Sequence, residues 1–287
     1  NRFDKAIDEH SKALEIDSTS LGARLDLGEV YYRLGNLDQA IPQFEAALKL
    51  ESGHLGALLR LGELYIRSGR YDDAIKIANS IISNSNNPPQ VLAQGYHFLG
   101  HAYAQRGNFI QAVENFQKVV KSNEQFALGH FNLGLAYSAQ GNFDQALEEL
   151  KTTLKLDPKQ TGALLNLAII YQQKGDDANA ILSCEAVLKL EPKNSLVHSI
   201  LSNIYISQKA FDKATEQVEL ITAEADEFRK ARLQLIENYK TSGTNPREPM
   251  AHLNLAIMYL FQNWNDQAIS ECQKALQSNP DNLIAYN

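Results

Sequence analysis

The sequence is poor in the residues that most often build active sites and metal centres. It contains two cysteines, two methionines and one tryptophan among 287 residues. It has no Gly-rich phosphate loop, no HExxH motif and no CxxC pair. Cys184 and Cys272 lie far apart in the sequence, so we expect two small buried apolar residues rather than a disulfide. We therefore expect no catalytic residue, no bound cofactor and no enzymatic activity.

Long apolar runs and long runs of one charge are also missing. A membrane-spanning helix needs roughly 20 consecutive apolar residues, and the best candidate, Ala163–Tyr171, is interrupted by Asn166. The formal net charge is −7 and the pI about 5.5, whereas nucleic-acid binding usually calls for basic patches. The expected partners are therefore other proteins or peptides, with no nucleic acid and no direct membrane insertion.

What the chain has in abundance is internal repetition. Residues 127–158 hold two amphipathic segments, each about one helix long, joined by Gly141-Asn142. The first segment carries a residue, usually small, that precedes a tyrosine by three. This mark recurs at Gly28/Tyr31, Gly62/Tyr65, Gly100/Tyr103, Gly134/Tyr137, Ala168/Tyr171, Ser202/Tyr205, Ile236/Tyr239 and Ala256/Tyr259. Successive marks lie 34, 38, 34, 34, 34, 34 and 20 residues apart, which indicates a repeat protein.

Two further series share this period. Alanines follow most of the marks by twelve residues, at Ala40, Ala74, Ala112, Ala146, Ala180, Ala214 and Ala268. Glycines stand between the two segments, at Gly35, Gly69, Gly107, Gly141, Gly175 and Gly243. Small residues let two helices approach closely, and a glycine can end the first helix in a left-handed conformation. One helix pair cannot bury its apolar face alone, so the pairs are expected to stack into a solenoid.

These motifs resemble the tetratricopeptide repeat (TPR) family. The resemblance is carried by LGEVYYRLGNLDQAIPQFEAALKL at 27–50, LGHAYAQRGNFIQAVENFQKVV at 99–120 and LAIIYQQKGDDANAILSCEAVLKLEP at 167–192. It covers nearly the whole chain, with about seven to eight repeat units. It implies an all-α fold, a right-handed α-solenoid of stacked antiparallel helix pairs forming a TPR superhelix. A fold of this kind does not define an activity.

The period also predicts the domain organisation. We expect one solenoid over 1–287, a fragment of a longer array. It divides into a half repeat at 1–20, six repeats over 21–228, a further repeat at 249–282 and the start of another helix at 283–287. Four extra residues, with two prolines, fall within 83–90 and are expected to form a longer surface loop.

The segment 229–248 breaks the period. It fits a first helix in register, but the next mark follows after 20 residues rather than 34. We favour a missing second helix, which would make the stack break or reverse after Gly243. The alternative is one long inserted helix over Ala223–Lys240.

In TPR proteins the first helices line a concave groove, and the resemblance places specific side chains there. Asn132, Asn166 and Asn254 share the sixth repeat position. They are similar to the asparagine ladder of the O-linked N-acetylglucosamine transferase repeats, where the amides hold an extended peptide backbone. An amide offers both a donor and an acceptor to a peptide unit. The alternative is that these asparagines support neighbouring helices.

The remaining candidate peptide-binding residues are apolar, imidazole and carboxylate groups in the same groove. They are Phe131, Leu135, Ile169, His97, His101, Glu29 and Glu63. His97 and His101 lie four residues apart, so both rings can share one helix face. Together with Glu63 or His130 they could hold a metal, but ordinary groove histidines are the favoured interpretation, and no metal site is predicted. A lysine is missing from the second repeat positions, which argues against a chaperone carboxylate clamp.

The leading functional hypothesis is a non-catalytic scaffold or adaptor that binds a peptide segment of partner proteins. One alternative is the substrate-recognition arm of a larger enzyme, such as a protein glycosyltransferase. Another is a structural scaffold that associates with itself through open solenoid ends.

Overall fold

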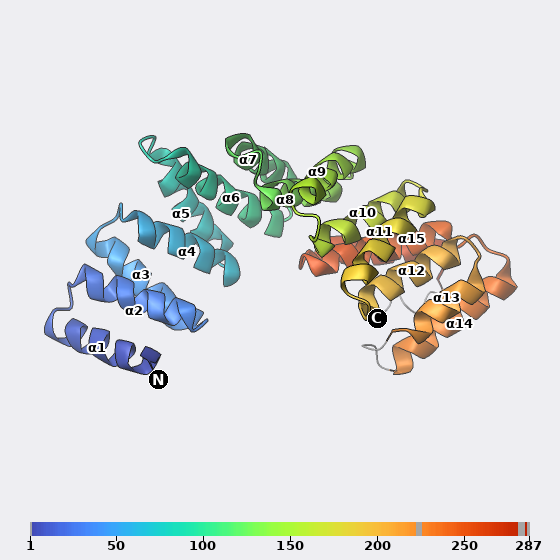
Figure 1. Ribbon diagram of the computed structural model, residues 1–287, viewed down its shortest axis with the longest axis horizontal. Helices are drawn as coiled ribbons and strands as arrows, with labels where there is room; N and C mark the ends of the chain where they lie inside the picture. Colours follow the sequence, from blue (N-terminus) through green and yellow to red (C-terminus); the bar gives the residue numbers. More distant parts are fainter. Residues whose placement is uncertain (1, 222–225, 281–284, 286–287) are drawn as a thin grey trace. The chain divides into compact units, whose positions relative to one another are not determined.

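The computed structural model describes residues 2–221, 226–280 and 285, and across them the chain is helical (Figure 1). The helices run α1 Arg2–Ile16, α2 Leu21–Arg33, α3 Leu37–Leu50, α4 Leu55–Arg67, α5 Tyr71–Ser83, α6 Pro89–Gln105, α7 Phe109–Ser122, α8 Ala127–Ala139, α9 Phe143–Leu156, α10 Thr161–Gln173, α11 Asp177–Leu190, α12 Ser195–Ser207, α13 Phe211–Glu219, α14 Asp226–Ser242, α15 Arg247–Phe261 and α16 Asn265–Ser278. The all-α solenoid of helix pairs predicted from the period is confirmed.

The turn inside each pair follows from glycine. All six glycines of the series have φ between 69° and 78°, in the left-handed region; five stand inside helix pairs, and Gly243 follows α14, which has no second helix. Lys209 and Asn263 take the same place in two other turns, with φ of 60° and 58°. The next helix then starts at a capping residue, since the Asn36 and Asn108 side chains accept hydrogen bonds from the backbone N–H three residues on.

The core of each pair is built from the small-residue series. Six of the seven alanines are fully buried and Ala268 is nearly so. A Cβ atom at Gly28 would lie 3.0 Å from the Phe44 ring, and one at Gly100 would lie 2.5 Å from the Phe116 ring. The absence of a side chain at these marks is therefore what lets an aromatic ring from the following helix fill the space.

The chain divides into two compact units, where the period predicted a single solenoid. Unit 1 comprises Asn1–Glu124 and unit 2 comprises Gln125–Asn287. Each repeat in a solenoid depends on its neighbours alone, so a regular period is compatible with such a division. The start of a further helix predicted at 283–287 lies largely outside the described residues.

The extra residues at 83–90 differ from the expected longer loop. Most of them lengthen α6, which has 17 residues where α4 and α8 have 13. Pro89 stands at the first position of α6, where a proline has no hydrogen bond to lose and its fixed φ suits a helix. Asn87 Nδ2 donates to the carbonyl oxygen of Ile81 at 2.8 Å and ties the short connection down.

The period breaks in unit 2 at a change of packing partner. The first helices α4, α6, α10, α12 and α14 each pack on the second helix of the preceding pair. The next helix, α15, follows α14 after a connection of four residues, and it packs on α12 and α10 as well as on its own partner α16. The chain therefore turns back after Gly243, and α15 lies on first helices from earlier in the same unit.

Candidate functional site

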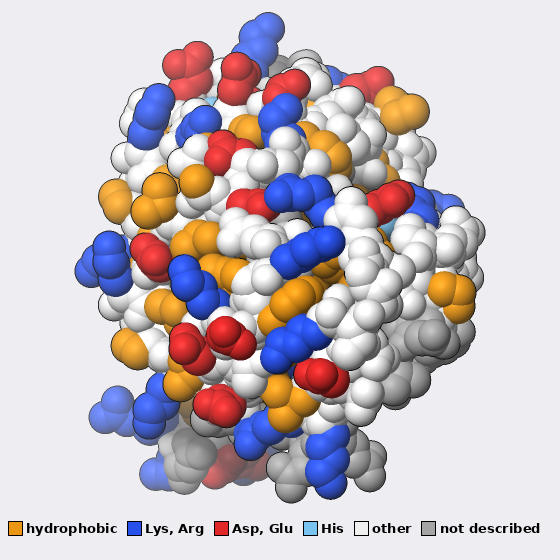
Figure 2. Space-filling model, turned by 90° about the vertical axis from the view of Figure 1, so that its right-hand side faces the viewer, with side chains coloured by type: hydrophobic (Ala, Val, Ile, Leu, Met, Phe, Trp, Pro, Cys, Tyr) orange, Lys and Arg blue, Asp and Glu red, His pale blue; other side chains and the backbone are white. Residues whose placement is uncertain are grey.

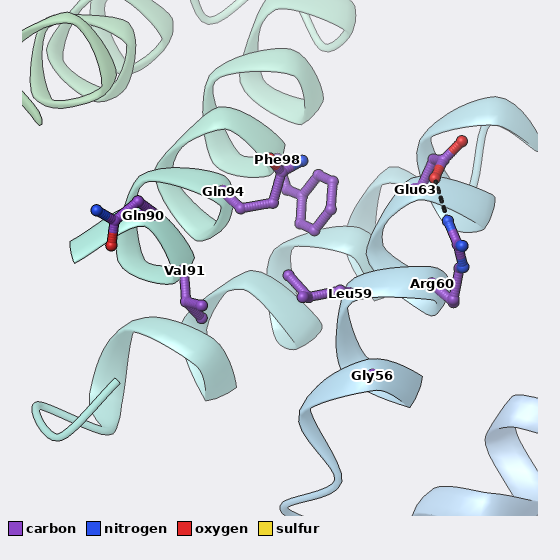
Figure 3. A pocket seen from close by; sticks show the side chains of 8 residues that line it. All are labelled: Gly56, Leu59, Arg60, Glu63, Gln90, Val91, Gln94 and Phe98. Atoms are coloured by element: carbon purple, nitrogen blue, oxygen red, sulfur yellow. Dashed lines mark ion pairs between the residues drawn. The ribbon is translucent and has the colours of Figure 1, made fainter. Parts of the chain in front are cut away.

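An open cavity lies between α4 and α6 in unit 1. Its volume is about 480 Å³, and Figure 3 shows its lining side chains. They are Gly56, Leu59, Arg60, Glu63, Gln90, Val91, Gln94 and Phe98. The ring of Phe98 projects from α6 toward α4, and the Arg60–Glu63 pair stands on the α4 side (Figure 3). We call this cavity the unit 1 groove, and it contains Glu63, one of the predicted site residues.

Charged side chains beside the unit 1 groove form a connected network. Arg60 donates through Nε to Glu29 Oε2 at 3.0 Å and through Nη2 to Glu29 Oε1 at 3.3 Å. Its guanidinium carbon lies 4.4 Å from the centre of the Tyr32 ring. The Tyr32 hydroxyl donates to Glu63, and this hydrogen bond, followed by burial, raises the pKa of Tyr32. The structure thus brings the predicted residues Glu29 and Glu63 together around one arginine.

The predicted histidine pair packs against the core of unit 1. The ring centres of His97 and His101 are 4.6 Å apart, and His101 meets Phe116 edge-on at 5.5 Å. Burial lowers the pKa of His97 to about 3 and that of His101 to about 4. Both rings are therefore neutral at pH 7, and the pair shares its space with an aromatic core residue.

The sequence left open a metal site at His97 and His101, which would need a third ligand beside them. Among the described residues, no three His, Cys, Asp or Glu side chains gather where they could hold a metal ion. His130, which the sequence offered as a neighbour, has its Nδ1 2.6 Å from Glu149 Oε2 on α9.

The predicted groove residue Asn254 lies on α15 and is buried against α10 and α12. Asn254 is fully buried, where the sequence suggested an amide facing an open groove. Its Nδ2 donates to Gln172 Oε1 at 2.6 Å, and its Oδ1 accepts from Asn203 Nδ2 at 2.7 Å. The Asn254 amide therefore joins α15 to α10 and α12, because this helix folds back on them.

The other unit 2 candidates also lie in buried surroundings. Asn166 is 5% exposed and donates through Nδ2 to the Gly162 carbonyl of its own helix at 2.7 Å. Asn132, Leu135 and Ile169 are buried too. A cavity of about 210 Å³ brings Phe131, Asn166 and Ile169 together with Ile257, Met258 and Phe261 of α15, along with Gln160, Gly162, Leu165, Leu196, Ile200 and Gln262. Phe131, Asn166 and Ile169 thus face α15 within unit 2.

Two sets of polar contacts were missed by the sequence reasoning. Arg247 at the start of α15 donates to Asp177 Oδ2 at 2.7 Å, a contact across 70 residues that no local pattern signals. The second set does have a signal. A histidine meets an acceptor nineteen residues later in His130/Glu149, His198/Gln217 and His252/Glu271. That constant separation joins the two helices of a pair.

On the face drawn in Figure 2, basic and acidic side chains of the described residues are interspersed, with hydrophobic side chains between them. Across the described residues, no helix is both long and apolar enough to span a membrane.

Stacked helix pairs with left-handed turns, buried alanines and grooves lined by first helices define a class of helical-repeat proteins. Sequence profiles described as "Tetratricopeptide repeat" match residues 25–89 and 131–195, 1–42, and 251–282. A further profile, described as "TPR repeat", matches residues 100–141. Together these matches cover well over half of the sequence. The chain belongs to the tetratricopeptide repeat family.

Solved structures show the same fold. One is the crystal structure of a MamA protein, whose sequence is 25% identical to this chain. The match covers 60% of this chain and 92% of the MamA chain, with a TM-score of 0.53. A tetratricopeptide repeat protein from Parabacteroides merdae is 16% identical in sequence. The match covers 93% of this chain and 99% of that protein, with a TM-score of 0.61. YrrB, described as a TPR protein with an unusual peptide-binding site, is 19% identical in sequence. The match covers 66% of this chain and 95% of YrrB, with a TM-score of 0.52. None of the curated proteins matches this chain.

The family membership suggests a general kind of function. Tetratricopeptide repeat proteins generally bind other proteins or peptides, and they are typically non-catalytic scaffolds. The fold therefore suggests a protein–protein interaction scaffold.

Proposed function

We propose that this protein is a non-catalytic scaffold that binds a peptide segment of a partner protein in the unit 1 groove. The observation that carries the proposal is the open cavity of about 480 Å³ bounded by Arg60, Glu63 and Phe98. It is large enough for one or two side chains of a bound peptide, and its walls offer both polar and apolar contacts.

The chemistry of the walls indicates which peptide fits. Leu59, Val91 and Phe98 supply apolar surface, and burying one leucine-sized peptide side chain there stabilises binding by roughly 1.5–3 kcal/mol. Gln90 and Gln94 offer amide donors and acceptors to the peptide main chain. We expect a segment with one large apolar residue beside a polar or charged residue.

In the proposed complex, Arg60 orients the bound peptide. Glu29 holds its guanidinium through two hydrogen bonds, and the face of Tyr32 lies 4.4 Å from it. A guanidinium fixed in this way needs little reordering when a peptide carboxylate or carbonyl approaches, so less binding free energy is lost to immobilising the side chain.

The test is selection of peptides from a displayed library by the intact chain, followed by affinity measurements on Arg60→Ala. We expect the selected peptides to bind Arg60→Ala at least tenfold more weakly. The matched control is Lys49→Ala, which removes an exposed cation from α3 and should leave the affinity unchanged. Equal affinity for the parent, for Arg60→Ala and for Leu59→Ala would exclude this groove as the binding site.

A further inference from the structure

The packing of α15 differs from that of the other first helices that follow a second helix within the same unit. The first helices α4, α6, α10, α12 and α14 each pack on the second helix that precedes them. Between α14 and α15 the chain has no second helix, and α15 lies on α12 and α10 instead. We call the surface of α8, α10 and α12 that α15 covers the unit 2 groove. Its residues occupy the repeat positions that line the open groove of unit 1.

Polar contacts hold α15 in the unit 2 groove at three levels. At its N-terminal end, Arg247 donates to both carboxylate oxygens of Asp177, the first residue of α11 at the edge of the groove, at 3.3 and 2.7 Å. At its centre, Asn254 joins Gln172 and Asn203. Toward its C-terminal end, the Ser138 hydroxyl of α8 donates to Met258 Sδ at 3.6 Å. The chain's own helix is therefore oriented in the groove as a bound helical ligand would be.

The fit between α15 and the unit 2 groove is incomplete. Among the described residues, the buried atoms Asn166 Oδ1, Gln172 Nε2 and Asn203 Oδ1 have no hydrogen-bond partner. Because a helix commits its main-chain groups to its own turns, these atoms can be paired by a helical ligand whose side chains differ from those of α15. The cavity of about 210 Å³ also remains between Asn166 and Ile169 of the groove and Ile257 and Met258 of α15. A ligand that paired these atoms and filled this space would fit better than α15 does.

We propose that the unit 2 groove is a binding site for an amphipathic helix of a partner protein, and that α15 competes with that helix as an internal ligand. The partner helix carries a basic residue near its N-terminus for Asp177, an amide at its centre for Gln172 and Asn203, and large apolar residues in its last turn. The chain between α14 and α15 is four residues long, which gives α15 a high effective concentration at the groove. This proposal is independent of the peptide site in unit 1.

The experiment uses the full chain and a fluorescent synthetic peptide of residues 247–262 as the probe. Binding is followed by fluorescence polarisation. The double variant Arg247→Ala/Asn254→Ala loosens α15 and leaves the groove residues intact, so we expect it to bind the probe at least tenfold more tightly than the parent. The matched control, Leu260→Ala, truncates an exposed side chain of the same helix and should bind like the parent. A probe carrying Asn254→Ala should lose at least tenfold in affinity for the double variant.

A second measurement keeps the proposal testable if the double variant does not fold. Hydrogen exchange of the parent should show the amides of α15 exchanging faster than those of α10, because α15 leaves the groove without global unfolding. The proposal is overturned if α15 and α10 exchange together at the rate of global unfolding. It is also overturned if a folded double variant binds the probe no better than the parent, or exchanges α15 with a second copy as a dimer and binds no probe.

Discussion

The two units carry grooves at the same repeat positions, but one is open and the other is filled. In unit 1 the sixth and ninth positions of a repeat are Arg60 and Glu63, each with 38% of its side chain exposed. In unit 2 the same positions are Asn166 and Ile169, which are 5% and 2% exposed. The first pair must keep its charges solvated or paired, whereas an amide and an aliphatic side chain can be covered at low cost.

This comparison shows that the side chains of a groove decide whether it accepts a helix of its own chain. Covering Glu29, Arg60 and Glu63 would remove water from three charges at once. Covering Asn166, Asn203 and Ile169 buries apolar surface and leaves amides that Asn254 can partly satisfy. The two units are therefore expected to respond differently to acid and to mutation.

The largest expected effect is a loss of unit 1 stability in mild acid. Burial lowers the pKa of His97 to about 3 and of His101 to about 4, whereas an unfolded histidine titrates near 6.5. The unfolded state therefore binds more protons below pH 6.5, and stability falls as the pH drops toward the folded values. Between pH 7 and pH 5 we expect a loss of about 2 kcal/mol per histidine.

Urea unfolding followed by circular dichroism at pH 7 and pH 5 measures this loss. The variant His97→Gln/His101→Gln should have a much flatter pH dependence over that range. Hydrogen exchange at pH 5 should place the weakening in α6 and α7 rather than in unit 2. An equal loss in the parent and the double variant would assign the acid sensitivity to other groups.

A smaller loss is expected when the central contact of the unit 2 groove is removed. Asn254→Ala leaves Gln172 and Asn203 without their buried partner, which costs roughly 2–4 kcal/mol. The matched control is Gln273→Ala on α16, an exposed position where we expect a change below about 0.5 kcal/mol. Urea unfolding at pH 7 provides the measurement, and equal values for the two variants would contradict a stabilising role for Asn254.

The next effect lies in the contact between α15, which fills the unit 2 groove, and its partner helix α16. Burial alone would raise the pKa of Glu271, but hydrogen bonds from His252 and Lys274 outweigh it and lower that pKa below its usual value. Glu271 therefore stabilises the folded state above pH 4.5, and this contribution is lost as the pH falls through the lowered value. Glu271→Gln should cost about 1–2 kcal/mol at pH 7.

The pH range separates this effect from that of the histidine pair. The stability difference between the parent and Glu271→Gln should persist from pH 7 to pH 5 and shrink below pH 4.5. Thermal melts of both proteins at pH 7, 5 and 3.5 measure it. A difference that vanished already at pH 5 would show that Glu271 is not held in its charged form by these contacts.

The parts of the fold that were predictable are those set by neighbours in sequence. The alanines, from Ala40 to Ala268, are buried because every helix pair needs a small residue at one fixed place. The positive φ angles at glycine follow from the same turn repeated. Glu29 and Glu63 could be assigned to one groove because they share a repeat position, 34 residues apart.

The parts that were not predictable depend on contacts across long separations. The shortened spacing signals an irregularity after Gly243, but it does not say where the next helix lies. That is decided by contacts such as Arg247 with Asp177, across 70 residues, and Asn254 with Gln172, across 82. For the same reason a position that reads as a groove amide, Asn254, is buried against its own unit. At 83–90 the two prolines suggested a loop, although Pro89 is compatible with the first turn of a helix.

The smallest expected effect on stability is at the centre of the unit 1 groove. Arg60→Ala removes hydrogen bonds to Glu29 and a cation–π contact with Tyr32, but the arginine side chain is 38% exposed and water screens its charge. We expect a change below about 1 kcal/mol in urea unfolding at pH 7, against a loss of roughly 2–4 kcal/mol for Asn254→Ala. If Arg60→Ala destabilised the protein as much as Asn254→Ala, the arginine would be a structural residue. The contrast between an open and a filled groove would then no longer hold, because a side chain available for a ligand must be one that the fold does not need.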